Sequence, residues 1–423
     1  MNLYKTIIEN EVFPAMGCTE PIACAYAAAL AAEQLDGDVE ELTLAVDKGT
    51  YKNGDAVIVP FTDGAKGNLI AAALGAYLKN PKLKLELLKE VTEESKLKAR
   101  ALCQKAKVVC LGEEKLFCVD VTVSNKHSSA RAVLFGGHTH ISRLEKNGKL
   151  IFEEEAAKKG ILAYRNQIKS MPIAELLHLV ESLDQDDLTN IEKGIKMNLA
   201  LIEKGHTLKK TGYQLEHMKE KGLIADDLFY RTKKSVGLAI DARMGGIDVP
   251  AMTSGGSGNQ GIITTLVPYI VGKELKIDNE KILRSIALAH IINAYTKCYI
   301  GELSVICGCA MSSGASSAAA IVFQHEGLHL KKIQNAIDNI VGDLSGLICD
   351  GAKPGCAMKS VTSVDSALRS AFMALEDCSP AMSDGVVGKT IEESIKNLAR
   401  ITIEGMLQVD PTVLKILQSK CAT

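Results

Sequence analysis

The first third of the chain alternates between helical and strand-like patterns of apolar positions. Apolar residues at three- and four-residue spacing predict helices over 3–11, 20–34 and 66–78. Strand-like runs predict strands over Glu41–Asp47 and Val57–Pro60. Helices and strands that follow one another in this way are typical of an α/β arrangement.

Strand patterns dominate the next segment, which follows a charged helix predicted near 92–106. Period-two alternation and β-branched residues predict strands over 107–111, 116–124, 130–135 and 150–153. The first 165 residues therefore predict one α/β or α+β domain.

The pattern changes to helical spacing from about Met171 onward. The helices expected there span Ile173–Leu183, Leu188–Ile202, Ile277–Tyr295, Leu330–Leu347, Val361–Leu375 and Ile391–Leu407. Lys158-Lys159-Gly160 and Met171-Pro172 interrupt the pattern between the two regions. We therefore expect an α+β protein, with an α/β domain over residues 1–165 and an all-helical domain over residues 166–423.

Composition narrows the class of partner. With 49 basic and 51 acidic side chains, the formal charge is −2, which argues against a nucleic-acid or membrane-surface partner. The N-terminus shows no signal-peptide pattern, and the longest apolar stretch, Pro21–Ala32, is shorter than the roughly 20 residues that span a membrane. We expect a cytoplasmic protein. A homodimer is compatible with the sequence, which does not determine the oligomeric state.

Twelve cysteines in a chain expected in the reducing cytosol predict free thiols or metal ligands rather than disulfides. Cys307-Gly308-Cys309 and the loop from Cys349 to Cys356 stand out, because glycine and proline surround these thiols. Their spacing matches neither a zinc ribbon nor a bacterial ferredoxin. Spacing alone leaves two readings open, a metal or iron–sulfur site and a set of separate buried thiols.

Cys18 lies in Gly17-Cys18-Thr19-Glu20-Pro21, directly before a predicted helix whose early proline suits a first turn. A thiol at a helix N-terminus is expected to have a lowered pKa and thiolate character. A cysteine at a turn without a chemical role is the alternative.

Two further motifs are weaker. Gly256–Gly261 formally matches a dinucleotide fingerprint, but helices rather than a β-α-β unit surround it. The loop can either offer N–H groups to a carboxylate or simply let backbones approach closely. In His138-Thr139-His140, metal binding lacks an evident third ligand, and His138 is a candidate for lining a substrate pocket.

Together these motifs resemble those of the L-cysteine desulfidase family, which is related to the iron–sulfur-dependent L-serine dehydratases. The resemblance includes the Lys52-Asn53 pair and extends from about residue 5 to beyond residue 400. It implies an N-terminal domain similar to the dehydratase β-domain and a helical domain similar to the dehydratase α-domain.

The resemblance also implies a [4Fe–4S] cluster with one open iron, held by Cys309, Cys349 and Cys356. Cys307 is a less favoured alternative to Cys309. Cys18 is then the candidate catalytic base or a labile fourth ligand. The residues expected to bind a small amino-acid substrate are Thr19, Glu20, Asn53, His138, Ser257, Gly258, Asn259 and Gln260.

The implied reaction is α,β-elimination of L-cysteine to pyruvate, ammonia and hydrogen sulfide. An L-serine dehydratase is the alternative within the same chemistry. A non-catalytic iron–sulfur or zinc protein that senses redox state is the alternative from another class.

Overall fold

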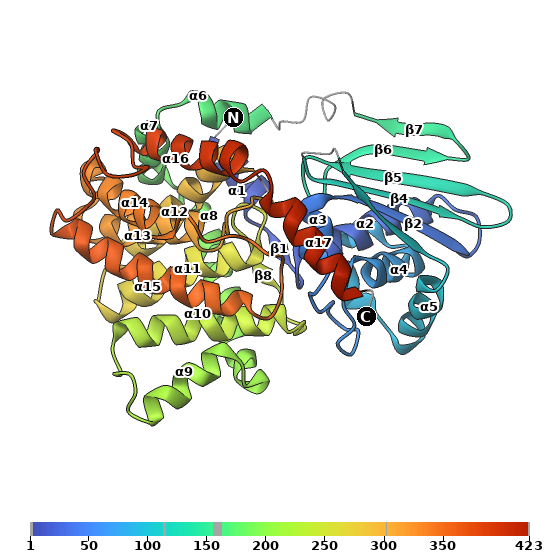
Figure 1. Cartoon of the computed structure of the whole chain (residues 1–423), viewed down its shortest axis with the longest axis horizontal. Helices are drawn as coiled ribbons and strands as arrows, with labels where there is room; N and C mark the ends of the chain where they lie inside the picture. The colour runs from blue at the N-terminus through green and yellow to red at the C-terminus, as the bar shows by residue number, and fades with distance from the viewer. Residues whose placement is uncertain (1–2, 113–115, 155–162, 302, 422–423) are drawn as a thin grey trace.

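The computed structural model describes residues 3–112, 116–154, 163–301 and 303–421. A six-stranded sheet with its covering helices forms one part of the molecule, and a large group of helices forms the other (Figure 1). This arrangement confirms the predicted α+β class. The interruption Lys158-Lys159-Gly160 lies outside the described residues, and the boundary near residue 165 stays a prediction.

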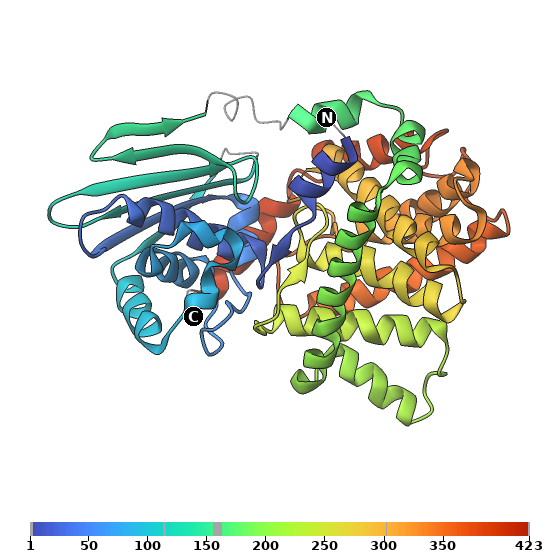
Figure 2. The same ribbon diagram turned by 180° about the vertical axis from the view of Figure 1, so that it is seen from behind.

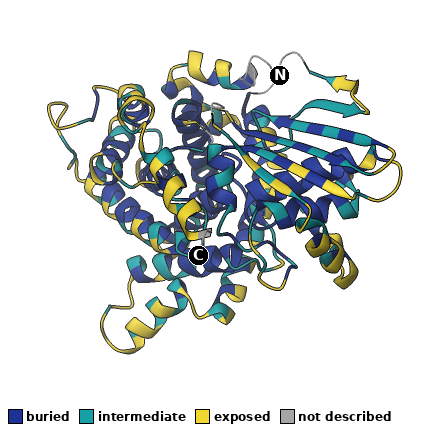
Figure 3. Ribbon diagram, turned by 45° about the vertical axis from the view of Figure 1, so that its right-hand side comes forward, coloured by how far each residue is buried: buried dark blue, intermediate teal, exposed yellow. Residues whose placement is uncertain are grey.

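The sheet has the strand order β3-β2-β4-β5-β6-β7, in which β2 and β3 are parallel and all other neighbours are antiparallel. Its strands are β2 (Glu41–Asp47), β3 (Lys107–Leu111), β4 (Cys118–Ser124), β5 (Ser129–Phe135), β6 (Ile141–Lys146) and β7 (Lys149–Glu153). Buried and partly exposed residues alternate along β4 and β5, because one face of these strands packs against α2 (Thr19–Glu33). The edge strand β7 is largely exposed (Figure 3).

Besides α2, the sheet-bearing part contains α3 (Lys48–Gly54), α4 (Asn68–Leu78), the 3₁₀ segment η1 (Pro81–Glu90) and α5 (Glu93–Cys103). Helix α2 is buried along almost its whole length, and alanine is its most frequent residue. Small side chains let α4 approach it closely. At Gly75 of α4, a Cβ atom would lie 1.9 Å from the carbonyl oxygen of Ala25. This contact fixes α2, whose first turn carries part of the candidate site.

The helical part is built around a second hydrophobic core. Its helices are α6 (Ala163–Ser170), α7 (Ile173–His178), α8 (Gln185–Gly205), α9 (Thr211–Glu220), α10 (Leu228–Met244), α11 (Gly258–Glu274), α12 (Asn279–Ile300), α13 (Met311–Glu326), α14 (Leu330–Leu344), α15 (Cys356–Leu375), α16 (Ile391–Arg400) and α17 (Val409–Cys421). Short 3₁₀ or π turns follow α7, α8 and α16.

Both ends of the chain cross between the two parts. Near the N-terminus, α1 (Leu3–Glu11) packs against the helical part, and β1 (Pro14–Ala15) pairs with β8 (Ala251–Met252) (Figure 2). Near the C-terminus, α17 packs against α3 of the sheet-bearing part. The segments around the candidate site therefore come from both ends of the sequence.

The structure confirms most of the predicted helices and strands within a few residues. The strand expected at Val57–Pro60 is wrong, because only an isolated bridge from Ile58 to Lys66 forms there. The apolar pattern did not predict β6, α3, α6, α9, α10, α13 or α17, nor the two-residue strands β1 and β8. Helix α13 lacks a clear apolar stripe because it is rich in alanine and serine that are buried all round.

None of the helices in the described parts of the chain is both long and apolar enough to cross a membrane.

Replacing Gly75 by alanine should destabilise the protein by about 2 kcal/mol or more, because the added methyl group meets the backbone of α2 rather than a movable side chain. Urea denaturation would measure the change. Gly346→Ala is the matched control, since a Cβ atom there meets no atom within 4 Å. Equal stabilities for the two variants would contradict the close contact between α2 and α4.

Candidate active site

A cavity lies between the sheet-bearing part and the helical part and brings together nearly all of the predicted site residues. Its wall includes Cys18, Thr19, Glu20, Asn53, His138, Ser257, Asn259, Gln260, Cys309, Cys349 and Cys356. Cys307 also lines it. Of the predicted site residues only Gly258 does not line the cavity, although the two residues before it, Gly256 and Ser257, do.

Cys18 is the N-cap residue of α2, and Glu20 lies in the first turn of the same helix. The Cys18 thiol donates a hydrogen bond of 2.8 Å to Glu20 Oε2. Thr19 Oγ1 donates to the same carboxylate oxygen at 3.2 Å, and Asn53 Nδ2 donates to Glu20 Oε1 at 2.8 Å. The buried carboxylate of Glu20 is therefore held on both oxygens by neighbouring side chains.

The expected thiolate character of Cys18 is wrong for this arrangement. Burial and the negative charge of Glu20 raise the pKa of the Cys18 thiol well above its usual value, and together they outweigh the helix N-terminus. For Glu20 itself burial acts to raise the pKa, but the charge of His138 and the hydrogen bonds from Cys18 and Asn53 lower it overall. The charged member of the pair is the carboxylate, and Cys18 holds its proton.

Asn53 reaches the site from α3, whose start is fixed by Asp47 at the end of β2. The Asp47 carboxylate accepts hydrogen bonds from the Gly49 and Thr50 N–H groups and from the N–H of Cys118 on β4. One side chain thus ties the helix that carries Asn53 to two strands of the sheet.

His138 lies in the turn between β5 and β6 rather than in a strand. Its ring packs against Phe117, with ring centroids 4.5 Å apart, and it is close enough to Glu20 for its charge to act on that carboxyl group. His140 points elsewhere, since its ring nitrogens contact Phe135 O and Glu154 Oε2 at 2.8 Å each. The structure therefore separates the two histidines, and only His138 lines the cavity.

The two cysteine motifs are held side by side by backbone hydrogen bonds. An antiparallel bridge joins Ile306 to Ile348, and the N–H groups of Cys307 and Cys349 donate to the carbonyls of Leu347 and Val305. Cys356 begins α15 a short loop later. Segments that are 40 residues apart in the sequence thus present their thiols to one cavity.

Cys307 and Cys309 behave as a linked pair. The Cys309 thiol donates a hydrogen bond to Cys307, which lowers the pKa of Cys307 to about 7, with further help from the Ala310 N–H group and the charge of Lys359. The same bond and burial raise the pKa of Cys309. Cys349 and Cys356 are near enough for their charges to act on Cys309 as well.

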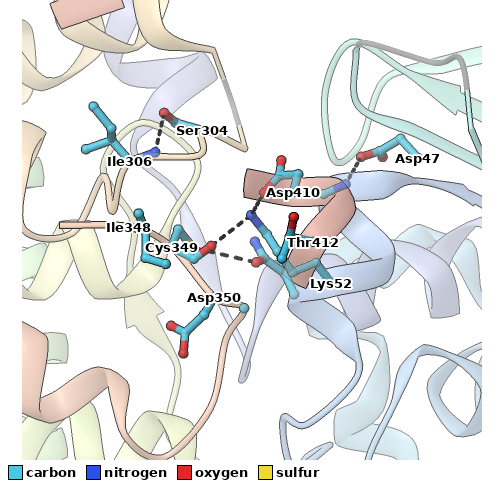
Figure 4. Close-up of polar contacts among 12 residues, drawn as sticks. Asp47, Lys52, Ser304, Ile306, Ile348, Cys349, Asp350, Asp410 and Thr412 are labelled. Atoms are coloured by element: carbon cyan, nitrogen blue, oxygen red, sulfur yellow. Dashed lines mark hydrogen bonds and ion pairs between the residues drawn. The ribbon is translucent and has the colours of Figure 1, made fainter. Parts of the chain in front are cut away.

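The buried ammonium group of Lys52 connects the cysteine loop to the rest of the site. Lys52 is 1% exposed, and its Nζ lies 3.0 Å from the carbonyl oxygen of Cys349 and 2.6 Å from Asp410 Oδ1 (Figure 4). Gly351 has a φ of +96°, and a Cβ atom there would lie 2.5 Å from the carbonyl oxygen of Lys52. The loop can therefore approach α3 this closely only with glycine at this position.

The glycine-rich segment forms the start of α11, with Ser257 as its N-cap. Gln260 packs on the cysteine turn, because a Cβ atom at Gly308 would lie 2.6 Å from Gln260 Nε2. Close backbone approach, one of the two expected roles, is confirmed, because a Cβ atom at Gly261 would lie 2.0 Å from the carbonyl oxygen of Met252. The role as a helix N-terminus at a ligand site stays a prediction. The strand that precedes α11, β8, pairs antiparallel with β1 and forms no parallel β-α-β unit in the described structure.

The cavity wall also carries two buried cations that the sequence did not predict, Arg243 near the end of α10 and Lys297 near the end of α12. The Arg243 guanidinium donates to Asn259 Oδ1 at 2.8 Å, and Lys297 Nζ donates to the carbonyl oxygen of Gly255. Both cations have polar as well as apolar neighbours along their helices, such as Asp241 and Thr296, so the sequence carries no clear signal of their burial.

The donor set on this wall suits a soft metal group. Thiols select zinc, copper(I) or iron–sulfur clusters over hard cations. Among the described residues, no three histidine, cysteine or acidic side chains are gathered as they would be around a single ion. The thiols of Cys307, Cys309, Cys349 and Cys356 instead line a shared cavity. Burial raises the pKa of the Cys349 thiol, and the nearby charges of Lys52 and Lys359 act in the opposite direction.

Comparisons with known proteins find relatives that match along nearly the whole chain. A family model for the serine dehydratase alpha chain matches residues 82–415. A UPF0597 protein from Geobacter sulfurreducens is 46% identical over 427 residues, covering 100% of both chains. A UPF0597 protein from Elusimicrobium minutum is 44% identical over 422 residues, which is 99% of this chain and 100% of the relative. The name UPF0597 specifies no substrate.

Replacing Asp410 by asparagine should destabilise the protein by about 3 kcal/mol, because it leaves the buried charge of Lys52 without a counterion. Urea denaturation of the full chain would measure the loss. Asp226→Asn is the control, since Asp226 forms exposed ion pairs that contribute less than about 1 kcal/mol. A cost for Asp410→Asn no greater than that of the control would show that Lys52 does not depend on this contact.

The pKa values also predict how the thiols react in the protein without a metal group. The rate of iodoacetamide labelling at the Cys307–Cys309 turn should rise as the pH passes about 7, because one proton of the pair is lost there. Cys103, whose pKa burial raises to about 11, is the internal reference. Peptide mass spectrometry would follow both sites. A Cys307 profile that parallels that of Cys103 would contradict the linked pair.

Proposed function

The chain belongs to the family of the serine dehydratase alpha chain, and from this premise we propose that it is an iron–sulfur-dependent lyase acting on L-cysteine. The reaction gives pyruvate, ammonia and hydrogen sulfide. The observation that carries the proposal is that Cys18, the cysteines of both C-terminal motifs and the start of α11 line one cavity. The preference for L-cysteine rests on the resemblance of the motifs, taken together, to those of the L-cysteine desulfidase family.

In this proposal Cys309, Cys349 and Cys356 hold a [4Fe–4S] cluster. Such a cluster supplies a Lewis-acidic iron that makes the β-thiol of the substrate a better leaving group. Cys307 shares the turn with Cys309 and has the lower pKa of the two, so it is the alternative ligand from that turn.

Cys18 and Glu20 are the groups that move the substrate proton. Cys18 can accept the Cα proton only after its own proton has passed to Glu20 Oε2, with which it already shares a hydrogen bond. Asn53 and Thr19 hold the Glu20 carboxylate in place for this transfer. Cys18 is then the base, and Glu20 activates it by accepting its proton. The alternative is that Cys18 would be a labile fourth ligand of the cluster.

The proposed elimination consumes only L-cysteine and water. The electron pair of the Cα–H bond forms the Cα–Cβ double bond, the Cβ–S bond breaks, and the sulfur leaves as sulfide. The resulting aminoacrylate takes up water and releases ammonia and pyruvate.

L-Serine is the second candidate substrate, because the matching family model is that of the serine dehydratase alpha chain. The same residues would then remove water instead of hydrogen sulfide. The two substrates differ at one atom, and the direct comparison of their rates decides between them.

The test is anaerobic reconstitution with iron and sulfide, followed by assays of pyruvate, sulfide and ammonia with L-cysteine and with L-serine. We expect brown protein that contains iron and releases sulfide and pyruvate in equal amounts from L-cysteine. Cys18→Ala should reduce turnover by about 10²-fold or more, the usual scale for a positioned acid–base group, with iron content unchanged.

Cys24→Ala is the matched control, because Cys24 is also a buried thiol on α2 but does not line the cavity. Near wild-type sulfide release by iron-loaded Cys18→Ala would show that Cys18 is structural. Full activity in protein that contains no iron by elemental analysis would overturn the cluster-dependent mechanism. A loaded protein inactive toward both substrates would favour a redox sensor.

A further inference from the structure

Arg243 is a buried cation on the cavity wall that lacks an anionic partner. The residue is 2% exposed. Within the described part of the chain, no carboxylate oxygen lies within 4 Å of its guanidinium group. By contrast, the cationic side chains of Lys52 and Arg165 form ion pairs with Asp410 and Glu11. Burying a charge without a counterion is costly, so the position calls for an anion that the protein itself does not supply.

The guanidinium group also has unused hydrogen-bonding capacity. It carries five N–H donors. Nη1 donates to Asn259 Oδ1 at 2.8 Å, and Nε is buried without a hydrogen-bond partner among the described residues. A carboxylate is the anion whose two oxygens match the planar donor fork of arginine.

A helix N-terminus meets the same guanidinium group. Gly258 is the first residue of α11, and a Cβ atom there would lie 2.2 Å from Arg243 Nε. Ser257, the N-cap, makes no side-chain capping bond, so the first N–H groups of this helix are left for another acceptor. The positive end of the helix and the guanidinium charge therefore favour negative charge at one place.

A hydrogen-bond acceptor without a partner among the described residues lies in the first turn of α11. Gln260 is 5% exposed and lines the cavity, and its Oε1 has no hydrogen-bond partner among the described residues. An amide oxygen suits an ammonium group. The start of α11 thus brings together two buried groups, the guanidinium donors of Arg243 from α10 and the amide oxygen of Gln260.

We propose that this wall is the recognition subsite for an α-amino acid, in which Arg243 binds the α-carboxylate and Gln260 Oε1 accepts from the α-ammonium group. The assignment deepens the proposed function and rests on it for the identity of the side chain that reacts. Arg243 is also near enough to Cys18 for its charge to act on that thiol. A carboxylate bound there therefore places Cα on the side of the cavity where Cys18 and Glu20 lie.

The test is equilibrium binding of non-reactive probes to the full-length chain by isothermal titration calorimetry. L-Alanine carries both groups, L-alaninamide lacks the carboxylate, and propionate lacks the ammonium. We expect L-alanine to bind at least about 10-fold more tightly than either. Arg243→Gln should weaken L-alanine binding by about 10- to 100-fold, the scale of one charged hydrogen-bonded pair, and leave L-alaninamide unchanged.

Arg231→Gln is the matched control, because Arg231 lies on the same helix but forms exposed ion pairs with Asp226 and Glu274. It should leave all three affinities unchanged. Arg243→Lys keeps the charge and should recover part of the preference for L-alanine over its amide. Gln260→Leu should reduce the preference for L-alanine over propionate.

Folded Arg243→Gln protein that binds L-alanine as tightly as the wild type would overturn the assignment. If that variant does not fold, the wild type alone decides, since equal affinities for L-alanine and L-alaninamide would overturn it as well. Binding that depends on Arg243 in a protein inactive toward L-cysteine and L-serine would refute the proposed reaction and keep the subsite. Lyase activity of the wild type, together with an unchanged preference of Arg243→Gln for L-alanine over L-alaninamide, would keep the proposed reaction and refute the subsite.

Discussion

One buried ammonium group, that of Lys52, joins three segments of the chain on which the candidate site depends. It contacts the carbonyl of Cys349 in the cysteine loop and the carboxylate of Asp410 at the start of the last helix, while its own helix carries Asn53. A buried ion pair contributes less to stability than to geometry, because desolvation offsets most of the attraction. Its effect here is to set the position of the cysteine loop against the sheet-bearing part.

The site lies where two hydrophobic cores meet. Helix α2 belongs to the core of the sheet-bearing part, yet Cys18 at its N-terminus packs into the core of the helical part. Through this helix, the packing of each part affects the position of the thiol. The crossing of both chain ends between the parts strengthens the same junction.

Charge is distributed unevenly across the cavity. Lys52, Arg243 and Lys297 are buried cations, while Glu20 is a buried anion held by Asn53, Thr19 and Cys18. Because Lys52 is paired with Asp410, Arg243 on the helical wall is the cation that we propose attracts an anionic group, while Glu20 at the start of α2 is a separate proton acceptor beside Cys18. Such separation suits a small zwitterion that must present its Cα–H bond to a base.

The sequence alone determined the α+β class, most helices and strands, and the set of motifs that gather at the cavity. Local information suffices for these, because apolar periodicity, glycine and proline act within a few residues. It could not give the contact of Gly351 with Lys52, the isolated Arg243 or the raised pKa of Cys18. These depend on which distant groups lie nearby and on how far water is excluded, and the burial of Cys18 beside Glu20 outweighed the local effect of the helix N-terminus. Only the tertiary structure decides which charges face one another across the cavity.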